Sequence, residues 1–329
     1  MKVLFIGGTG NISTSVSKLC IKKGIDLYLL NRGLRENTIE KARIINGDIN
    51  NLSQIKEILK DHQWDAVVNW IAFHENDIER DIELFRNKTK QYIFISSASA
   101  YQKPPLNPII TESTPLKNPF WEYSRNKIAC EERLNKAYRE EDFPITIVRP
   151  SLTYDTVIPV AIGGWTEYTI IDRMKKGKKI IVHGDGTSLW VVTHAEDFAK
   201  GFVGLIGNQY AIGNAFHITT DEVLTWNQIY ETIAEAINVE PNIIHIPSDF
   251  IVKHESSLMG SLLGDKSYSV IFDNYKIKKY VPDFTAIISF KEGIKRTIDW
   301  FDAKPERKII RKETDDMMDR IIHLYEKNI

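Results

Sequence analysis

The sequence predicts an α/β protein in which a doubly wound parallel sheet is joined to a smaller mixed C-terminal lobe. Short apolar runs alternate with segments of helical periodicity through the first half of the 329 residues, which is the βαβ pattern of a parallel sheet. The runs at 67–68 and 92–95 lack polar alternation, as central strands covered on both faces do. A glycine-rich turn directly follows the first run. Together these observations indicate six or seven parallel strands.

Each element of the first half follows from this alternation. We expect strands at residues 3–6, 26–30, 42–45, 66–69, 92–96 and 145–148 and helices at 13–23, 52–60, 77–85 and 123–139. Beyond residue 150 the pattern predicts helices near 165–175, 226–237 and 289–327, and strands at 180–182 and 243–246. The proline-containing stretch 107–119 is expected to be a surface loop at the rim of the site.

Composition narrows the class of protein. The chain has 43 Lys and Arg against 44 Asp and Glu, and this balance gives no electrostatic reason to expect nucleic acid or a membrane as partner. The N-terminal apolar run is too short for a signal peptide, and no later run approaches ~18 residues, so we expect a cytoplasmic protein. Cys20 and Cys130 lack clustered partners and are expected to be reduced thiols, without a metal site.

Two basic clusters interrupt this balance. One has four lysines within residues 175–179, and the other has Arg307-Lys308 and Arg311-Lys312. A solvated surface is the favoured interpretation, although binding of RNA would use such a patch.

The segment Tyr123-Ser-Arg-Asn-Lys127 indicates an enzyme. A spacing of four on a helix places the phenol and the ammonium on one face, roughly 5–6 Å apart at Cβ, where the cation favours the phenolate. Such a tyrosine is a usable acid or base. Ser97, at the end of an expected buried strand, completes a proton-transfer group.

The turn Gly7-Gly8-Thr9-Gly10-Asn11-Ile12 opens the first expected helix. In this context helix N–H groups can receive a pyrophosphate, so Gly7, Thr9, Gly10, Asn11 and Ile12 are candidate cofactor ligands. The alternative is that these residues form a purely structural strand-to-helix turn that binds no ligand. Residues 1–150 are therefore expected to form an NAD(P)-binding domain and residues 151–329 mainly a substrate lobe, with some segments returning to the first domain.

The end of the second strand should decide between NAD and NADP. No acidic residue is present there. Asn31 and Arg32, followed by Arg35, lean toward the 2′-phosphate of NADP, although Arg32 could instead stack on adenine. Asp48 could accept a hydrogen bond from the adenine amino group, or it could simply form a turn.

Further motifs follow in a fixed order: Asn69-Trp-Ile-Ala72, Ser96-Ser-Ala-Ser-Ala-Tyr101, Arg149-Pro-Ser-Leu-Thr-Tyr154, Gly184-Asp-Gly-Thr187 and Phe272-Asp-Asn-Tyr-Lys276. Together with the glycine turn and Tyr123, they resemble the extended short-chain dehydrogenase/reductase superfamily, of the NAD-dependent epimerase/dehydratase type. The resemblance runs nearly end to end. It implies a Rossmann-type sheet, an NAD or NADP cofactor and, commonly, a homodimer.

The resemblance also implies roles for single residues. Ser97 would hydrogen-bond the substrate hydroxyl or carbonyl, Tyr123 would exchange its proton, and Lys127 would grip the nicotinamide ribose and lower the pKa of the tyrosine. Ser99 is the competing serine. Ala72, Pro150 and Leu152 would contact the cofactor.

One position departs from the family. Nucleotide-sugar enzymes of this type carry an arginine shortly after Gly-Asp-Gly, whereas this chain has Trp190, which cannot clamp a diphosphate. The departure resembles an atypical subgroup that includes chloroplast RNA-associated proteins. Tyr154, Trp165 and Trp190 are candidates for an aromatic substrate wall, with core packing as an equal alternative.

The sequence thus predicts an NAD(P)-dependent oxidoreductase or epimerase that acts on a hydroxyl carbon of a sugar-like small molecule. An alternative is a cofactor-binding regulator that binds RNA or a protein and has weak or no catalysis. A redox sensor with cofactor binding and no turnover is a third possibility.

Overall fold

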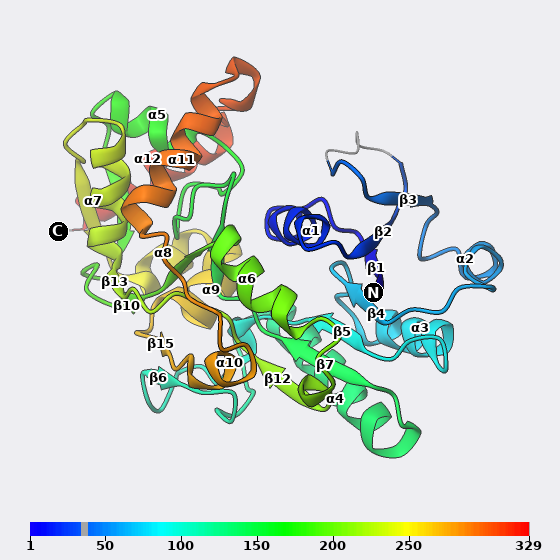
Figure 1. Cartoon of the computed structure of the whole chain (residues 1–329). Helices are drawn as coiled ribbons and strands as arrows, with labels where there is room; N and C mark the ends of the chain where they lie inside the picture. Colours follow the sequence, from blue (N-terminus) through cyan, green and yellow to red (C-terminus); the bar gives the residue numbers. More distant parts are fainter. Residues whose placement is uncertain (34–38, 329) are drawn as a thin grey trace.

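The computed structural model describes residues 1–33 and 39–328, and a seven-stranded parallel sheet forms its centre (Figure 1). The strand order is β12-β7-β5-β4-β1-β2-β3, so the chain starts in the middle of the sheet and winds outward in both directions. The strands are β1 (Lys2–Ile6), β2 (Asp26–Asn31), β3 (Arg43–Asn46), β4 (Ala66–Asn69), β5 (Tyr92–Ile95), β7 (Ile145–Val148) and β12 (Asn214–Phe216). The predicted Rossmann-type fold is confirmed, with seven strands.

Helices cover both faces of the sheet and explain its continuous apolar strands. On one face lie α1 (Ser13–Lys22), α6 (Ala195–Leu205) and α10 (Tyr275–Tyr280). On the other lie α2 (Leu52–Ile58), α3 (Glu75–Phe85) and α4 (Glu122–Glu141). All four residues of β4 and of β5 are buried, as a strand with helices on both sides requires.

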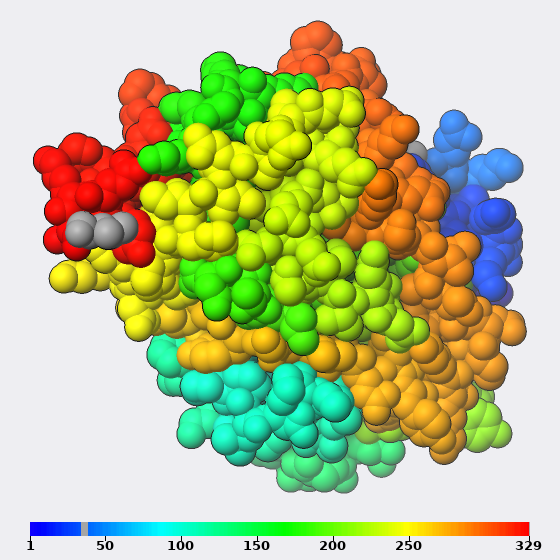
Figure 2. Space-filling model, turned by 90° about the vertical axis from the view of Figure 1, so that its left-hand side faces the viewer, coloured from blue at the N-terminus to red at the C-terminus, as the bar shows by residue number. Residues whose placement is uncertain are grey.

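The second half of the chain builds a lobe beside the carboxyl ends of the strands (Figure 1). Its helices are α5 (Thr169–Lys175), α7 (Trp226–Ala236), α8 (Ser248–His254), α9 (Met259–Ser261), α11 (Phe290–Asp302) and α12 (Lys312–Glu326). Its short paired strands are β8 (Leu152–Tyr154) with β11 (Val192–His194), β9 (Ile180–His183) with β14 (Ile243–Ile246), and β10 (Leu189–Trp190) with β13 (Leu224–Thr225). Figure 2 shows one face of the molecule, most of which this half covers.

Three local expectations differ from the structure. The expected helix 289–327 is two helices, α11 and α12, because Pro305 opens a separate 3₁₀ turn between them. Helix α5 begins at Thr169 rather than near residue 165. The loop at 107–119 contains a short strand, β6 (Ile109–Ile110), which pairs with β15 (Ile271–Phe272).

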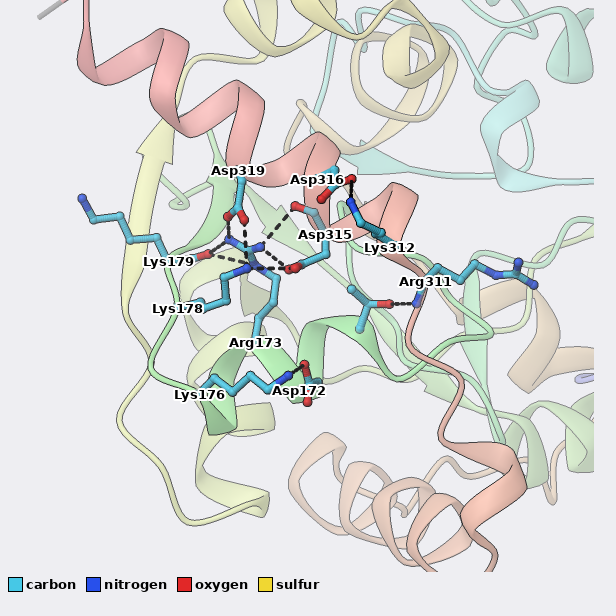
Figure 3. Close-up of polar contacts among 11 residues, drawn as sticks. Asp172, Arg173, Lys176, Lys178, Lys179, Arg311, Lys312, Asp315, Asp316 and Asp319 are labelled. Carbon is cyan, nitrogen blue, oxygen red and sulfur yellow. Dashed lines mark hydrogen bonds and ion pairs between the residues drawn. The ribbon is translucent and has the colours of Figure 1, made fainter.

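A buried arginine attaches the C-terminal helix to the lobe (Figure 3). Arg173 on α5 is 1 % exposed and pairs with Asp315 and Asp319 of α12, the latter at 2.7 Å. Its guanidinium also donates to the carbonyl oxygen of Lys179 at 2.6 and 3.1 Å. Lys178 lies beside it and reaches the same two carboxylates at 2.8 Å. The two cations and two carboxylates balance in charge.

The same region contains the two basic clusters of the sequence. Their cations have local partners: Lys176 pairs with Asp172, Lys179 with Glu326, Lys308 with Asp302, Arg311 with Glu167 and Lys312 with Asp316, while Lys175 donates to the Tyr168 hydroxyl and Arg307 lies over Trp300. Carboxylates of the protein thus offset most of this charge. This arrangement fits the solvated-surface interpretation and does not favour an RNA-binding patch.

Two further expectations from the sequence concern membrane-spanning segments and the state of the two cysteines. Across residues 1–33 and 39–328, no helix is long and apolar enough to cross a membrane. Cys20 and Cys130 are both free and buried, and burial raises the pKa of each thiol to about 12. Both thiols are therefore protonated and unreactive at neutral pH.

The ion pairs of Arg173 with Asp315 and Asp319, called the Arg173 clamp below, predict that Arg173→Met weakens the attachment of α12. We expect a loss of about 2–4 kcal/mol in the free energy of unfolding, because two carboxylates lose their buried partner. Hydrogen exchange should accelerate first in residues 312–326. The matched control is Lys312→Met on the same helix, whose ion pair with Asp316 is exposed and should leave stability almost unchanged. Equal effects of the two substitutions would contradict the Arg173 clamp.

Candidate active site

Helix α4 carries the tyrosine and the lysine of the expected proton-transfer group. Its start is fixed by Asn118, whose side-chain oxygen accepts hydrogen bonds from the backbone N–H groups of Phe120 and Trp121 at 3.2 and 3.1 Å. Tyr123 lies in the first turn and Lys127 one turn later, so both face the carboxyl ends of β4 and β5. The Lys127 Nζ atom lies 5.8 Å from the centre of the Tyr123 ring.

Lys127 is held by backbone carbonyls. Its Nζ atom donates to Ala72 O at 2.6 Å and to Ile95 O at 2.8 Å, and it lies 4.4 Å from the centre of the Phe73 ring. The side chain is almost fully buried, and this burial lowers its pKa from 10.5 to about 8. The charged form is thus stabilised by dipoles and aromatic faces, which only partly replace water.

The pKa of Tyr123 differs from the expectation. Burial raises it, and a hydrogen bond with Ser97 opposes that rise only in part. The nearby carboxylate of Asp265 raises it further. The pKa of Tyr123 is therefore raised and not lowered as expected, because burial withdraws the phenolate from water.

The two candidate serines have different environments. Ser97 is half-buried and interacts with Tyr123, whereas Ser99 is 4 % exposed. The Ser99 hydroxyl lies 2.9 Å from that of Ser97 and accepts a hydrogen bond from Ser124 on α4 at 2.7 Å. Ser97 is thus the serine that faces Tyr123, and Ser99 supports it from behind.

A buried ion pair connects the elements around these residues. Arg149, directly after β7, donates to both carboxylate oxygens of Glu131 on α4, at 2.6 Å to Oε2 through Nη2 and at 2.9 Å to Oε1 through Nε. The hydroxyl of Ser96, at the end of β5, donates to the same carboxylate at 2.5 Å. Glu131 lies one helical turn after Lys127. The ends of β5 and β7 are thereby fixed against α4.

The glycine turn has the geometry that a dinucleotide needs. Gly7 and Gly8 adopt φ angles of +92° and +107°, and a Cβ atom on Gly8 would lie 2.8 Å from a methyl group of Leu29. Helix α1 begins after Ile12 without a side-chain cap, so no N-cap side chain competes with an anion for its first N–H groups, one of which, Thr14 N, donates to Gly10 O at 3.0 Å. Asn11 donates to Thr153 O at 2.9 Å, and its buried Oδ1 atom has no hydrogen-bond partner among the described residues. These residues fit an NAD-type cofactor.

The other candidate cofactor residues lie around the same edge of the sheet. Arg32 is exposed after β2, and the side chain of Asn31 accepts a hydrogen bond from Gly33 N at 3.1 Å. Asp48 accepts from Asn50 N at 3.0 Å, as a turn-forming aspartate does. Arg35 lies outside the described residues.

Three apolar candidates line the middle of that edge. Ala72, Pro150 and Leu152 are all buried. The Ala72 carbonyl binds Lys127, and the Pro150 carbonyl accepts from Ala98 N at 2.8 Å, next to Ser97. These contacts place both residues beside the proton-transfer group.

The expected aromatic wall divides into two parts. Tyr154 and Trp190 are at most 1 % exposed and pack in the lobe core, and this burial favours the core-packing alternative for both. Trp165 is 37 % exposed and donates through its indole nitrogen to Val160 O at 3.0 Å. Of the three rings, only Trp165 presents substantial surface to a substrate.

Sequence reasoning missed two aromatic rings that contact Tyr123. The ring centres of Trp121 and Phe73 lie 5.1 and 6.2 Å from that of Tyr123. Phe73 is 42 % exposed, which is unusual for a ring beside a buried lysine. The available signal was position alone: Phe73 directly follows the motif Asn69–Ala72, and Trp121 lies two residues before Tyr123.

A parallel sheet with a glycine turn after its first strand, and a Tyr-x-x-x-Lys helix at its carboxyl edge, defines the extended short-chain dehydrogenase/reductase class. The sequence profile of the NAD dependent epimerase/dehydratase family matches residues 3–218, and the chain belongs to this family. The resemblance inferred from the motifs is thereby confirmed, as is the expectation of an enzyme of this type.

Individual relatives are more distant. The chain is 24 % identical over 265 residues to the chloroplast stem-loop binding protein of 41 kDa b of Arabidopsis thaliana, covering 76 % of this chain and 67 % of that one. It is 31 % identical over 169 residues to the UDP-glucose 4-epimerase of Lactobacillus helveticus, covering 45 % and 51 %. The UDP-glucose 4-epimerase of Bifidobacterium longum, solved with NAD⁺ and UDP, superposes with a TM-score of 0.73 at 16 % identity over 93 % of this chain and all of that chain.

The lowered pKa of Lys127 predicts a pH dependence of stability. Between pH 8 and 10 the folded protein loses this proton while the unfolded chain, with a lysine pKa of 10.5, retains it. The unfolded state then binds more protons, so this lysine makes the free energy of unfolding rise with pH, by up to about 1.4 kcal/mol per unit. Chemical denaturation of Lys127→Met across this range should lack that contribution. Parallel curves for the two proteins would rule the shift out.

Proposed function

We propose that this protein is an NAD(P)-dependent oxidoreductase or epimerase that acts on a hydroxyl-bearing carbon of a sugar-like molecule through Ser97, Tyr123 and Lys127. The observation that carries the proposal is that these three side chains lie together at the end of β5: Tyr123 interacts with Ser97, and Lys127, one turn away, donates to Ile95 O at 2.8 Å with its Nζ atom 5.8 Å from the centre of the Tyr123 ring. The nicotinamide of the cofactor would accept or return a hydride at this carbon.

The roles follow from position. Ser97 donates a hydrogen bond to the reacting oxygen and holds it against Tyr123. The Tyr123 phenol, whose raised pKa keeps it protonated at neutral pH, is suited to donate a proton to a carbonyl oxygen in the reductive direction. In the oxidative direction the phenol must lose that proton, and its interaction with Ser97 favours this loss. Lys127, one turn away on α4, would hold the nicotinamide ribose. The aromatic rings of Phe73 and Trp121 exclude water beside the phenol.

The cofactor choice leans toward NADP. The family is NAD-dependent by description, but β2 ends at Asn31 and is followed by Arg32, so the end of this strand has no acidic residue to accept the ribose 2′-hydroxyl. The exposed guanidinium of Arg32 is suited to a 2′-phosphate.

The proposed substrate class rests on the names of relatives and on one position at which this chain differs from nucleotide-sugar enzymes of the family. Two relatives are described as UDP-glucose 4-epimerases and one as a 2′-dehydrokanamycin reductase, so sugar hydroxyls are the shared chemistry. The buried Trp190 stands where a diphosphate clamp would be, which argues against a nucleotide sugar. An RNA-binding role has weaker support, because the basic clusters are largely paired.

Tyr123→Phe tests the mechanism. The substitution removes only the transferable proton, so turnover should fall about 10²–10⁴-fold while cofactor affinity is retained. Turnover would be followed by nicotinamide absorbance with a panel of sugars and sugar derivatives, and affinity by titration calorimetry. Tyr275→Phe, at a 71 % exposed site, is the control. Unchanged turnover in Tyr123→Phe would refute the proposed role.

Arg32→Glu tests the cofactor choice. We expect NADP affinity to fall roughly tenfold or more, because a guanidinium–phosphate contact is replaced by repulsion, while NAD affinity changes little. Calorimetry with both cofactors gives the comparison, and Arg139→Glu at the exposed end of α4 is the control. An equal loss for NAD and NADP would instead indicate stacking on adenine.

A further inference from the structure

Two buried lysines lie next to the proposed active site and have no role in the proton-transfer group. Lys103 follows the turn that contains Ser97, and Lys266 ends the π-helical turn Leu262–Lys266. The residues are 3 % and 4 % exposed. Lysine is almost never this buried unless its charge is paired or used.

A single carboxylate serves both cations. Asp265 lies 3.6 Å from Lys103 Nζ and 3.5 Å from Lys266 Nζ, and it is the only ion-pair partner of either lysine among the described residues. These distances exceed the 2.7–2.9 Å of a tight charge-assisted hydrogen bond. The cluster therefore has one excess positive charge, and its ammonium groups have donors to spare. Burial lowers the pKa of Lys103, as expected for an incompletely compensated cation.

The cluster lies within reach of Tyr123. Lys266 Nζ is 5.9 Å from the ring centre of Trp121, which itself contacts the Tyr123 ring at 5.1 Å. The charge of Asp265 acts on the Tyr123 phenol. On its other side, Lys266 Nζ lies 5.7 Å from the ring centre of Trp165, which is partly exposed. The excess charge thus lies between the proposed reacting centre and an aromatic ring at the surface.

The backbone holds this cluster in place. The Lys266 carbonyl oxygen accepts hydrogen bonds from His183 Nε2 at 2.9 Å and from Trp226 Nε1 at 3.2 Å. Burial lowers the pKa of His183 to about 4, so this ring is neutral and adds no charge. Asn118 donates to Gly264 O at 2.7 Å and to Ser99 O at 2.8 Å. The turn that bears Asp265 and Lys266 is therefore tied to the serine turn of the active site.

We propose that Lys103 and Lys266 bind an oxyanion of the substrate, a phosphate or carboxylate carried by a compact sugar derivative whose reacting hydroxyl lies at Tyr123. This inference rests on the proposed function for the reacting hydroxyl. One excess positive charge beside the phenol matches a single anionic group about one sugar ring from the reacting carbon. The buried Trp190 ring, whose centre lies 5.7 Å from Lys103 Nζ, supplies no further cation for the diphosphate of a nucleotide sugar.

Calorimetry on the full chain with saturating cofactor tests the site. The probes are glucose 6-phosphate, glucuronate, glucose and UDP-glucose. We expect glucose 6-phosphate or glucuronate to bind at least roughly tenfold more tightly than glucose, and Lys103→Met and Lys266→Met each to remove most of that preference. Which of the two anions binds more tightly identifies phosphate or carboxylate. Tighter binding of UDP-glucose than of both compact anions would overturn the proposal.

A variant that binds the anion more tightly distinguishes a direct effect on the site from misfolding, which can only weaken binding. Asp265→Asn removes the competing carboxylate and should strengthen binding of the compact anion several-fold, an effect that partial unfolding cannot produce. Lys291→Met, at an exposed ion pair, is the matched control and should leave affinity unchanged. Anion affinity that is indifferent to Lys103, Lys266 and Asp265 overturns the site.

The two proposals fail separately. Loss of turnover in Tyr123→Phe with no anion preference leaves the proposed function standing and removes the anion site. Charge-dependent anion binding with full turnover in Tyr123→Phe refutes the proposed function and leaves the anion site standing.

Discussion

The buried ion pair between Arg149 and Glu131 is the constraint on which the site depends. It joins the end of β7 to the middle of α4, and through Ser96 it also includes the end of β5. A buried ion pair offsets the cost of its desolvation only if its donors and acceptors are hydrogen-bonded. Removal of one partner would leave an uncompensated buried charge. Here the carboxylate receives three donors, so the helix that carries Tyr123 and Lys127 has a fixed register against β5, which ends two residues before Ser97.

Burial then sets the chemistry of the residues that this pair positions. Desolvation lowers the pKa of Lys127 and raises that of Tyr123, so each pKa moves in the direction that favours the neutral form. Two backbone carbonyls and nearby aromatic faces partly compensate Lys127. Lys103 and Lys266 are also buried, and they share a single carboxylate, Asp265, at 3.6 and 3.5 Å. The site thus has more buried positive charge than its carboxylates offset, and an anionic ligand would correct that imbalance.

Much of the fold could be predicted because the sheet is buried on both faces. Continuous apolar strands and amphipathic helices gave six of the seven strands and most element positions to within two or three residues, whereas β12 in the second half of the chain was not predicted. The lobe was harder. The helical turns between residues 248 and 266 have no clear period, and the break at Pro305 is a local exception inside a long amphipathic pattern. Such short elements are defined by what they pack against rather than by their own periodicity.

By itself, the sequence determined the family, the parallel sheet, the glycine turn, and Ser97, Tyr123 and Lys127 as the candidate site, because these depend on spacing along one strand, turn or helix. Only the tertiary structure decided that Tyr154 and Trp190 belong to the core, that the basic clusters are paired, and that Lys103 lies beside Lys266, 163 residues later. It also reversed the expected pKa direction of Tyr123. The reason is physical: burial and charge balance depend on neighbours that chain folding brings together, and spacing along the chain does not record them.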